Sequence, residues 1–484
     1  MQTREAIANM RSKVWIAITT GLLLFSLAGF QGFKLYIDTK DFKNQLTSNI
    51  DSKILQKQSL KLEGDINRIL SISNLPVVTN VLNLFDLNFV KVKSELSAIA
   101  ISGPSILGTN RPKKYLIAFQ NSAEARGTGG ILGAFAVVEF KNGNLKVLRT
   151  GSNESLYQIS KTILPISVPA EFTKLYGNQP AILQNSNLSP HFPYGAEIWL
   201  ALWREKFGEQ LDGVIALDPT ALSYVLRATG PIALSTGEKI TSESLVRETL
   251  KDAYKRYEFD NPARKQYLVA IIDATVKQLT AGHYSKIRMA KAIRDAILEN
   301  RILLYSKDLN VEEQLSKVRL GGYMEIKANN EFRVVIQNID ASKLDYYIHK
   351  SVVIESKSCN VPRQTQIRVK VTNTLKSGKG LPSYVLTRDD KGKPASLVTG
   401  AHRFKLFVYG PTEAQLLSVS RENRSQGLGG ASTERGRPIY VADVDLKPGQ
   451  SENLLANFAG GVGKITFVDQ PLVIPTELSI KGGC

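Results

Sequence analysis

Residues 115–140 read YLIAFQNSAEARGTGGILGAFAVVEF, and the predicted organisation of the whole chain follows from this stretch. Residues 115–119 form an apolar run typical of a buried strand, and a second apolar run covers residues 131–140. Strand, polar glycine turn and strand predict a candidate site at one edge of a sheet. The polar side chains and glycines of the turn are Asn121, Glu124, Arg126, Gly129 and Gly130.

Two features of this turn suit an anionic ligand. Gly129 and Gly130 let backbone N–H groups approach a ligand closely, and Arg126 can pair with a phosphate through two parallel hydrogen bonds. The alternative is a tight connection between two strands whose charged side chains are solvated. The residues alone leave both interpretations open.

The composition is that of an ordinary globular protein with a basic surface. Its 484 residues are enough for two or three domains, with 43% apolar and 22% charged residues. The net charge of +18 favours polyanions: nucleic acid, anionic lipid head groups or phosphate-bearing wall polymers. The four histidines, at positions 191, 283, 349 and 402, and the two cysteines show no metal-ligand spacing, so a zinc site is not expected.

The N-terminus has the pattern of a membrane anchor. Residues 1–13 are basic and are expected to be cytoplasmic, and residues 14–33 contain no charged side chain. A helix of this length, at ~1.5 Å per residue, crosses the ~30 Å hydrocarbon core of a bilayer. We therefore expect a single-pass signal-anchor in the cell membrane. A cleaved signal peptide and an ordinary buried helix are the alternatives.

Both the anchor and the signal peptide export residues 35–484. Export makes nucleic acid an unexpected partner, so the positive charge points to the bacterial membrane surface or to an anionic wall polymer. A basic surface that is merely solvated is the other interpretation of the same charge.

The rest of the chain divides into three regions. Residues 34–110 place apolar residues at helical spacing and predict a membrane-proximal helical stalk. Residues 111–320 alternate strand and helix signals, which indicates an α/β domain with a mixed sheet and flanking helices. In residues 321–484 the helix signals nearly vanish, and short strand-like runs between turns predict an all-β sandwich.

Local signals within the α/β region are specific. Asp218-Pro219 is typical of a helix start and Gly230-Pro231 of its end. Trp199 and Trp203 lie four residues apart on a predicted helix, and we interpret this pair as core.

The two cysteines, Cys359 and Cys484, are predicted to form a disulfide outside the membrane. The bond would span 484 − 359 = 125 residues, and chain-entropy arguments assign such a loop on the order of 5 kcal/mol. Two independent thiols are the alternative.

No nucleophile elbow, P-loop or paired-carboxylate motif is present. Arginines hold phosphate through a fork of donors, and carboxylates can hold a divalent cation such as Mg²⁺ between phosphates. That combination suits pyrophosphate chemistry, where catalysis consists mainly of positioning and charge stabilisation. The loop NSNLSPHFP, residues 185–193, with Asn187, is either part of such a site or a plain connection. The residue types in question are Arg126, Gly129, Gly130, Asp212, Asp218, Asp260 and Arg264.

Three strings, QNSAEARGTGGILGAF, NSNLSPHFP and LDGVIALDPTALSYVLRATGPI, resemble the domain-of-unknown-function 4012 family. In the C-terminal region NTLKSGKGLPSYV, LFVYGPTEAQL and LKPGQ also fit, so the resemblance covers roughly residues 110–475. It implies a single-pass surface protein of bacteria, mainly Gram-positive ones. The family carries no established activity.

A more remote similarity is to the LytR-CpsA-Psr family, whose members transfer glycopolymers from a polyprenyl pyrophosphate carrier to peptidoglycan with Mg²⁺. This resemblance implies roles for Arg126 and for the D-x-x-x-R-[KR]-Q residues Asp260, Arg264 and Gln266. The chain departs from that family in two places. Gly129 and Gly130 stand where an aspartate follows the first arginine, and TGSNES, residues 150–155, lacks the family's S-I-P-R-D segment.

Two functions are compatible with these observations. In the first, the protein assembles envelope glycopolymer by binding a phosphorylated or polyprenyl-pyrophosphate-linked glycan around Arg126, with transfer left open. In the second, it is a non-catalytic envelope scaffold or polymer-binding protein, and Asn121, Glu124 and Arg126 form a structural network. An open groove where Arg126 and Arg264 converge favours the first; buried, mutually satisfied side chains favour the second.

Overall fold

The computed structural model describes residues 52–72, 98, 101–157, 166–358, 362–387, 398–421, 424–426 and 430–482. The predicted anchor at residues 14–33 and both cysteines, Cys359 and Cys484, lie outside the described residues, so the anchor and the disulfide stay predictions. Among the described residues, no helix is both long enough and apolar enough to span a membrane.

The chain forms two compact units. The first contains the residues up to Lys113 together with residues 140–144. Its helix α2 (Ser52–Ile72) falls in the region predicted as a helical stalk, and Leu62 and Ile66, four residues apart on it, are both buried. The second unit contains residues 114–139 and 145–484, and it carries the candidate site.

A mixed five-stranded sheet with the order β3-β2-β1-β4-β7 forms the α/β part of the second unit, as predicted. Strand β1 pairs with β4 in parallel, and β4 pairs with β7 antiparallel. The strands are β1 (Lys113–Arg126), β2 (Gly129–Lys141), β3 (Asn144–Ser152), β4 (Gly213–Leu217) and β7 (Ile302–Ser306).

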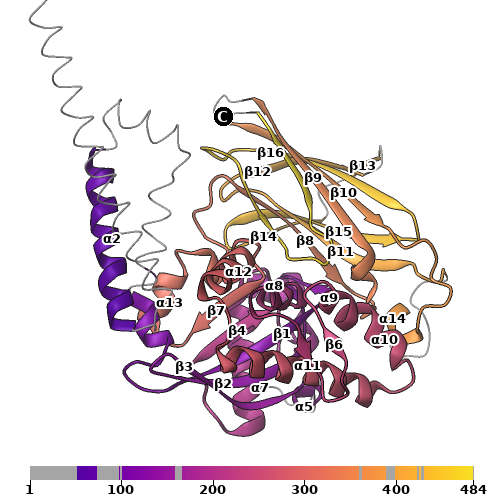
Figure 1. Ribbon diagram of the computed structural model, residues 1–484. Coiled ribbons are helices and arrows are strands. Elements are labelled where there is room, and N and C mark those ends of the chain that lie inside the picture. The colour runs from indigo at the N-terminus through magenta and orange to yellow at the C-terminus, as the bar shows by residue number, and fades with distance from the viewer. Residues whose placement is uncertain are drawn as a thin grey trace, which may run out of the picture. The chain divides into compact units, whose positions relative to one another are not determined.

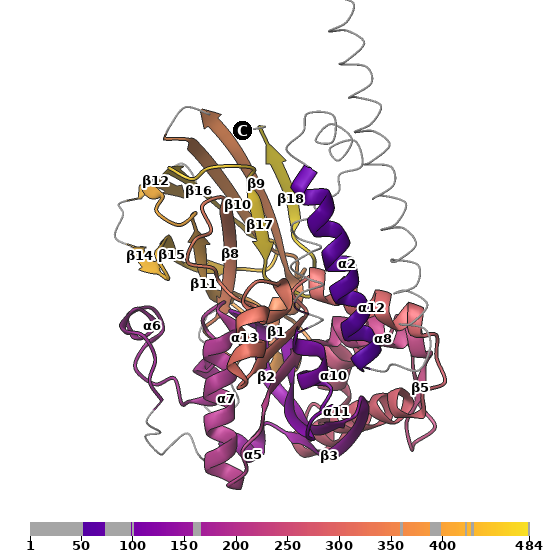
Figure 2. The ribbon, with the colours of Figure 1, turned by 90° about the vertical axis from the view of Figure 1, so that its left-hand side faces the viewer.

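Helices cover both faces of this sheet (Figure 2). Leu116 and Val214 pack into one core cluster with α7, which contains the fully buried Trp199 and Trp203. Phe119 and Ile215 face the other side, toward residues of α11, α8 and α12. The helical elements are α5 (Glu154–Tyr157), α6 (Ala170–Tyr176), η1 (Leu183–Asn185), α7 (Phe192–Phe207), α8 (Pro219–Thr229), α9 (Leu245–Arg247), the π-helical η2 (Glu248–Asp252), α10 (Ala253–Arg256), α11 (Asn261–Ala281), α12 (Lys286–Leu298), α13 (Leu309–Leu315) and η3 (Arg319–Gly321), with a small β5 (Ile232–Ala233) and β6 (Lys239–Ile240) hairpin between α8 and α9.

Two further sheets make up the C-terminal part and share one apolar core (Figure 1). Their orders are β13-β12-β16-β10-β9-β18 and β14-β15-β11-β8-β17, which confirms the predicted change to β structure. In β10 the residues Ile367, Val369 and Val371 point into this core, and the alternate residues point outward. The elements are β8 (Glu331–Asn338), η4 (Leu344–Tyr347), β9 (Ile348–Ser358), β10 (Gln364–Asn373), α14 (Ser383–Leu386), β11 (His402–Tyr409), β12 (Gln415–Arg421), β13 (Arg424–Gln426), β14 (Ala431–Glu434), β15 (Arg437–Leu446), β16 (Ser451–Ala459), β17 (Thr466–Asp469) and β18 (Glu477–Lys481).

Strand β1 is much longer than the sequence predicted, and it joins the two parts of the unit. The predicted polar turn was wrong in extent, because β1 continues to Arg126 and only Gly127 and Thr128 connect it to β2. At its far end Ala125 packs into the core of the C-terminal sheets, and its N–H donates to the carboxylate of Asp345 at 2.9 Å. Gln470 donates to the Arg126 carbonyl at 2.7 Å. The polar end of β1 can continue as a strand because residues of the C-terminal part, Asp345 and Gln470, hydrogen-bond to its backbone.

Substitution of Asp218 measures how much its buried ion pair contributes to the stability of the fold. It caps α8 by accepting from Ala221 N–H at 2.7 Å, and it is paired with the buried Arg301 at 2.6 Å. We expect Asp218→Ala to lower the free energy of unfolding by about 3–5 kcal/mol, because the substitution leaves the Arg301 charge buried without this partner.

The matched control is Asp260→Ala. Asp260 also caps a helix, accepting from Ala263 N–H at 2.9 Å, but it is exposed. Urea unfolding should show a loss of about 1 kcal/mol for this variant. Equal losses for the two variants would contradict the structural role assigned to the Asp218–Arg301 pair.

Candidate functional site

Arg126, at the end of β1, is buried and bound by the protein itself. Four of its five N–H groups have acceptors: Nε donates to the Gln184 carbonyl at 2.9 Å, and Nη1 donates to the Ala125 and Asn338 carbonyls at 2.9 and 3.1 Å. Nη2 donates to Glu124 at 2.8 Å. The guanidinium therefore has no pair of parallel N–H groups left for the bidentate phosphate contact that the sequence suggested.

Glu124 joins Arg126 to a cation far away in the chain. Its second oxygen is 2.5 Å from Nζ of Lys343, which also donates to the Ala341 carbonyl at 3.1 Å. Burial acts to raise the pKa of Glu124, but the charges of Lys343 and Arg126 outweigh it and hold the pKa below its usual range. Glu124 is thus an ionised carboxylate held between two cations.

Aromatic rings extend this network to Arg264. The Arg264 guanidinium lies 4.0 Å from the ring centre of Tyr384 and 4.4 Å from that of Tyr254. Lys343 Nζ lies 5.1 Å from the ring centre of Tyr384, and the Tyr254 hydroxyl accepts from Asn121 at 2.6 Å. The structure therefore links Asn121, Glu124, Arg126 and Arg264 in one network, through residues that the sequence did not identify.

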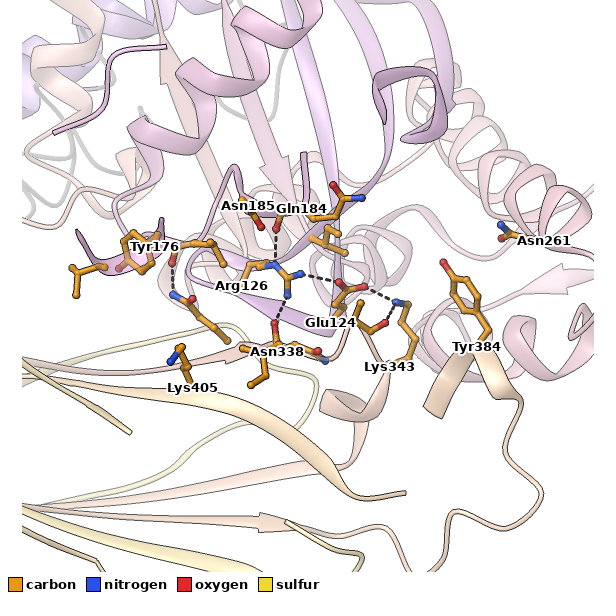
Figure 3. Close-up of a pocket in the computed structure, with 16 residues that line it drawn as sticks. Glu124, Arg126, Tyr176, Gln184, Asn185, Asn261, Asn338, Lys343, Tyr384 and Lys405 are labelled. Atoms are coloured by element: carbon orange, nitrogen blue, oxygen red, sulfur yellow. Dashed lines mark hydrogen bonds and ion pairs between the residues drawn. The ribbon is translucent and has the colours of Figure 1, made fainter. Parts of the chain in front are cut away.

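A cavity of about 620 Å³ lies beside this network. Figure 3 shows Tyr176 and Lys405 toward one end, Glu124 and Arg126 in the middle, and Tyr384 and Asn261 toward the other end. Its charged lining residues are three cations and one carboxylate, so the walls carry a surplus of positive charge. Its lining is Glu124, Arg126, Ile131, Leu175, Tyr176, Gln184, Asn185, Leu188, Asn261, Gln337, Asn338, Ile339, Ala341, Lys343, Tyr384 and Lys405.

The glycines of the predicted turn pack against protein and not against open space. Gly129 and Gly130 are both buried, and a Cβ on Gly130 would lie 2.2 Å from the backbone of Asn121. Asn187 is buried against the same hairpin, and its amide nitrogen donates to the Gly130 carbonyl at 2.8 Å and to Thr128 at 2.9 Å. Its loop thus braces the connection between β1 and β2.

Four other predicted site residues lie apart from the cavity walls. Asp212 and Asp218 sit at opposite ends of β4, roughly 20 Å apart at ~3.3 Å per residue, and Asp212 accepts from Lys114 N–H at 2.8 Å. Asp260 caps α11, and Gln266 is exposed on that helix. None of the four lines the cavity.

The arrangement does not fit Mg²⁺. Across the described ranges, no group of three His, Cys, Asp or Glu side chains could hold a metal ion. Glu124, the carboxylate of the cavity wall, already lies between Arg126 and Lys343, whose charges repel a divalent cation.

Sequence reasoning missed Lys343, Tyr254, Tyr384 and Lys405. Lys343 follows Glu124 by 219 residues, and neither Lys343 nor Lys405 stands in a motif. Tyr384 lies in NTLKSGKGLPSYV, residues 373–385, a string that supports the family resemblance but did not indicate a site, and Tyr254 follows no pattern that distinguishes it from a core residue. For the two lysines the available signal was the surplus of positive charge over the whole chain.

The fold and the site define a protein with a mixed α/β sheet, two packed C-terminal sheets and a cation-lined cavity at the end of β1. Residues 110–254 match the family described as "Protein of unknown function (DUF4012)", which confirms the predicted resemblance over these residues. No curated protein matches the chain. The similarity to the LytR-CpsA-Psr family stays a prediction.

Two solved structures show limited similarity. One, described as the transcriptional regulator yvhJ from Bacillus subtilis, is 12% identical and has a TM-score of 0.23, covering 43% of this chain and 77% of that chain. The other, described as a nutrient-binding protein from Legionella pneumophila, is 9% identical with a TM-score of 0.14, covering 27% and 43%. Similarity at this level carries no argument about function.

The buried network makes a prediction for Arg126. We expect Arg126→Ala to lower the free energy of unfolding by about 3–5 kcal/mol, since it removes one cation from a buried carboxylate and the donor from three backbone carbonyls. Arg288→Ala, which removes an exposed arginine on α12, should change it by less than about 0.5 kcal/mol. A folded Arg126→Ala of native stability that has lost anion binding would instead assign the guanidinium to the ligand.

Glu124 gives a prediction about pH. Because its pKa is lower in the folded protein, its contribution to stability is present above the ordinary value of 4.5 and is lost as pH falls through the folded pKa. Glu124→Gln should therefore be less stable than the native protein at pH 7, and the difference should shrink below about pH 4. Urea unfolding at several pH values between 3 and 7 measures both curves; a constant difference would contradict the assigned ion pairs.

Proposed function

We propose that this is a membrane-anchored, extracytoplasmic protein of cell-envelope glycopolymer assembly that binds an anionic, phosphate-bearing glycan in the cavity beside Arg126 and does not transfer it. The observation that carries the proposal is the contrast between two sets of charges. Arg126, Glu124 and Lys343 are committed to one another in the fold, whereas Lys405 adds positive charge to the walls of an open cavity and has only an exposed partner.

The cavity has the chemistry that a phosphate-bearing glycan requires. Lys343 spends two of its three N–H groups on Glu124 and the Ala341 carbonyl, so it belongs to the buried network and adds only its charge to the cavity wall. Lys405 is 38% exposed, and its partner Asp443 is 73% exposed, which makes their ion pair weak. Lys405 can therefore attract phosphate.

The neutral part of the lining suits sugar hydroxyls. Asn185, Asn261, Gln337 and Tyr384 contribute uncharged polar side chains to the lining of the same cavity. The volume of about 620 Å³ lies in the range of known ligand sites. A glycan bearing phosphates uses both kinds of contact, whereas free phosphate would use only the cations.

Binding without transfer is supported by the state of Arg126. Enzymes that move phosphoryl groups place free cationic donors on the phosphates, and here four of the five donors are occupied. The basic N-terminus and uncharged residues 14–33 support the membrane location, and the net charge of +18 supports an anionic envelope partner. A LytR-CpsA-Psr-like arrangement of the α/β part belongs to this proposal as the finer description of the fold.

Binding of a poly(glycerol phosphate) oligomer to the full chain in non-ionic detergent tests the proposal. We expect saturable binding at low salt and a loss of about tenfold in affinity for Lys405→Glu, the amount that a charged hydrogen bond contributes. Lys370→Glu is the matched control, since Lys370 is exposed on β10 and lies outside the cavity lining. It should bind as the native protein does.

Three results would count against this function. Absence of binding by the native protein, or equal weakening by the two lysine variants, would exclude the cavity as the glycan-binding site. Transfer of glycan from an undecaprenyl pyrophosphate disaccharide to peptidoglycan, with or without Mg²⁺, would overturn the claim that the protein only binds.

A further inference from the structure

Arg363, at the residue before β10, is buried with only part of its guanidinium satisfied. Its exposed fraction is 4%, and Nη1 donates to the Gly463 carbonyl at 2.5 Å. Among the residues that the structure describes, Nε and Nη2 have no hydrogen-bond partner. Buried polar atoms are nearly always paired, so this exception calls for an acceptor.

The two unpaired nitrogens are those that form a fork. In a guanidinium the Nε–H and one Nη2–H bond run parallel on the same side, which is the geometry that donates to two oxygens of a carboxylate or phosphate. Burial lowers the pKa of Arg363, and no carboxylate counteracts this effect. The charge is therefore uncompensated within the described part of the chain.

The carboxylate of Glu331 is bound by two other arginines. Glu331 pairs with Arg333 and with Arg437, each at 2.6 Å, and the Nη2 group of Arg437 donates to the Glu331 carbonyl at 3.0 Å. Arg437 is fully buried, and its Nε also has no partner among the described residues. Arg437 is thus a second buried guanidinium in the C-terminal sheets that lacks an acceptor for one nitrogen.

A glycine loop, residues 460–463, covers the fork. Gly460, Gly461 and Gly463 all have positive φ, and a Cβ on Gly461 would lie 2.9 Å from Nη2 of Arg363. The loop is held near Arg437 because Val462 N–H donates to the Asn329 carbonyl at 2.8 Å. The part of this segment that lies against Nη2 is therefore Gly461, while the Val462 side chain is exposed.

We propose that Arg363 and the loop 460–463 form a second anion site, separate from the cavity at Arg126, that binds one phosphate-type oxyanion on the Nε–Nη2 fork when the loop opens. The shared chemistry is that of a phosphate group, whether it is free inorganic phosphate or the terminal phosphate of a glycan. A carboxylate could accept the same two hydrogen bonds, and a titration with acetate distinguishes it from phosphate.

The test measures the thermal unfolding midpoint of the full chain in non-ionic detergent against rising phosphate, with chloride holding the ionic strength constant. We expect a saturable rise for the native protein. Arg363→Lys, which keeps the charge but loses the fork, should weaken the apparent affinity at least tenfold. Arg368→Gln removes an exposed arginine from the same strand and should respond as the native protein does.

Parallel titrations separate the sources and the sites. Glycerol 1-phosphate and acetate replace inorganic phosphate in turn, and a response to acetate alone would overturn the proposed phosphate ligand. Lys405→Glu should keep the phosphate response even where it loses glycopolymer binding, so the two proposals fail independently. Gly461→Ala, which narrows the space beside Nη2, should also weaken binding.

The native protein alone can refute the site. Equilibrium dialysis with labelled phosphate should show one saturable site per chain that is retained in Lys405→Glu. No saturable uptake by the native chain would overturn the proposal, as would full retention of uptake in folded Arg363→Lys.

Discussion

The buried carboxylate of Glu124 is the constraint on which the rest of the second unit depends. An ionised carboxylate removed from water is costly unless cations and donors surround it. Arg126, two residues along the same strand, and Lys343, 219 residues later, meet this requirement together. Strand β1 must therefore run past its own sheet to the segment after β8, and the cavity wall forms where these parts meet.

This constraint explains why Arg126, which the sequence suggested as an anion-binding residue, has its donors occupied by the protein. Arg126 stands in the most distinctive stretch of the sequence, yet its donors hold the backbone of the Gln184 loop and of β8. Lys405 and Arg363 stand in unremarkable strand sequences, yet one faces the cavity and the other keeps a fork without an acceptor. Positive charge that is used in folding differs from positive charge that remains for a ligand, and only the count of donors and acceptors separates them.

Local signals predicted much of the fold. Asp218 does cap α8 and Gly230 does end it, because capping depends on the few residues at a helix terminus. Trp199 and Trp203 are core, and β10 alternates as a strand with one buried face should. The same reasoning failed where distant partners intervene: Asp218 also holds Arg301, and the predicted glycine turn is mostly strand.

The amino-acid sequence by itself determined the mixed α/β part, the change to β structure, the similarity over residues 110–254 and the surplus of positive charge, since each depends on composition or on residues close together in the chain. Only the tertiary structure decided which charges are satisfied. Glu124 and Lys343, or Arg264 and Tyr384, meet because long stretches of chain fold between them, and an ion's partner is set by distance in space.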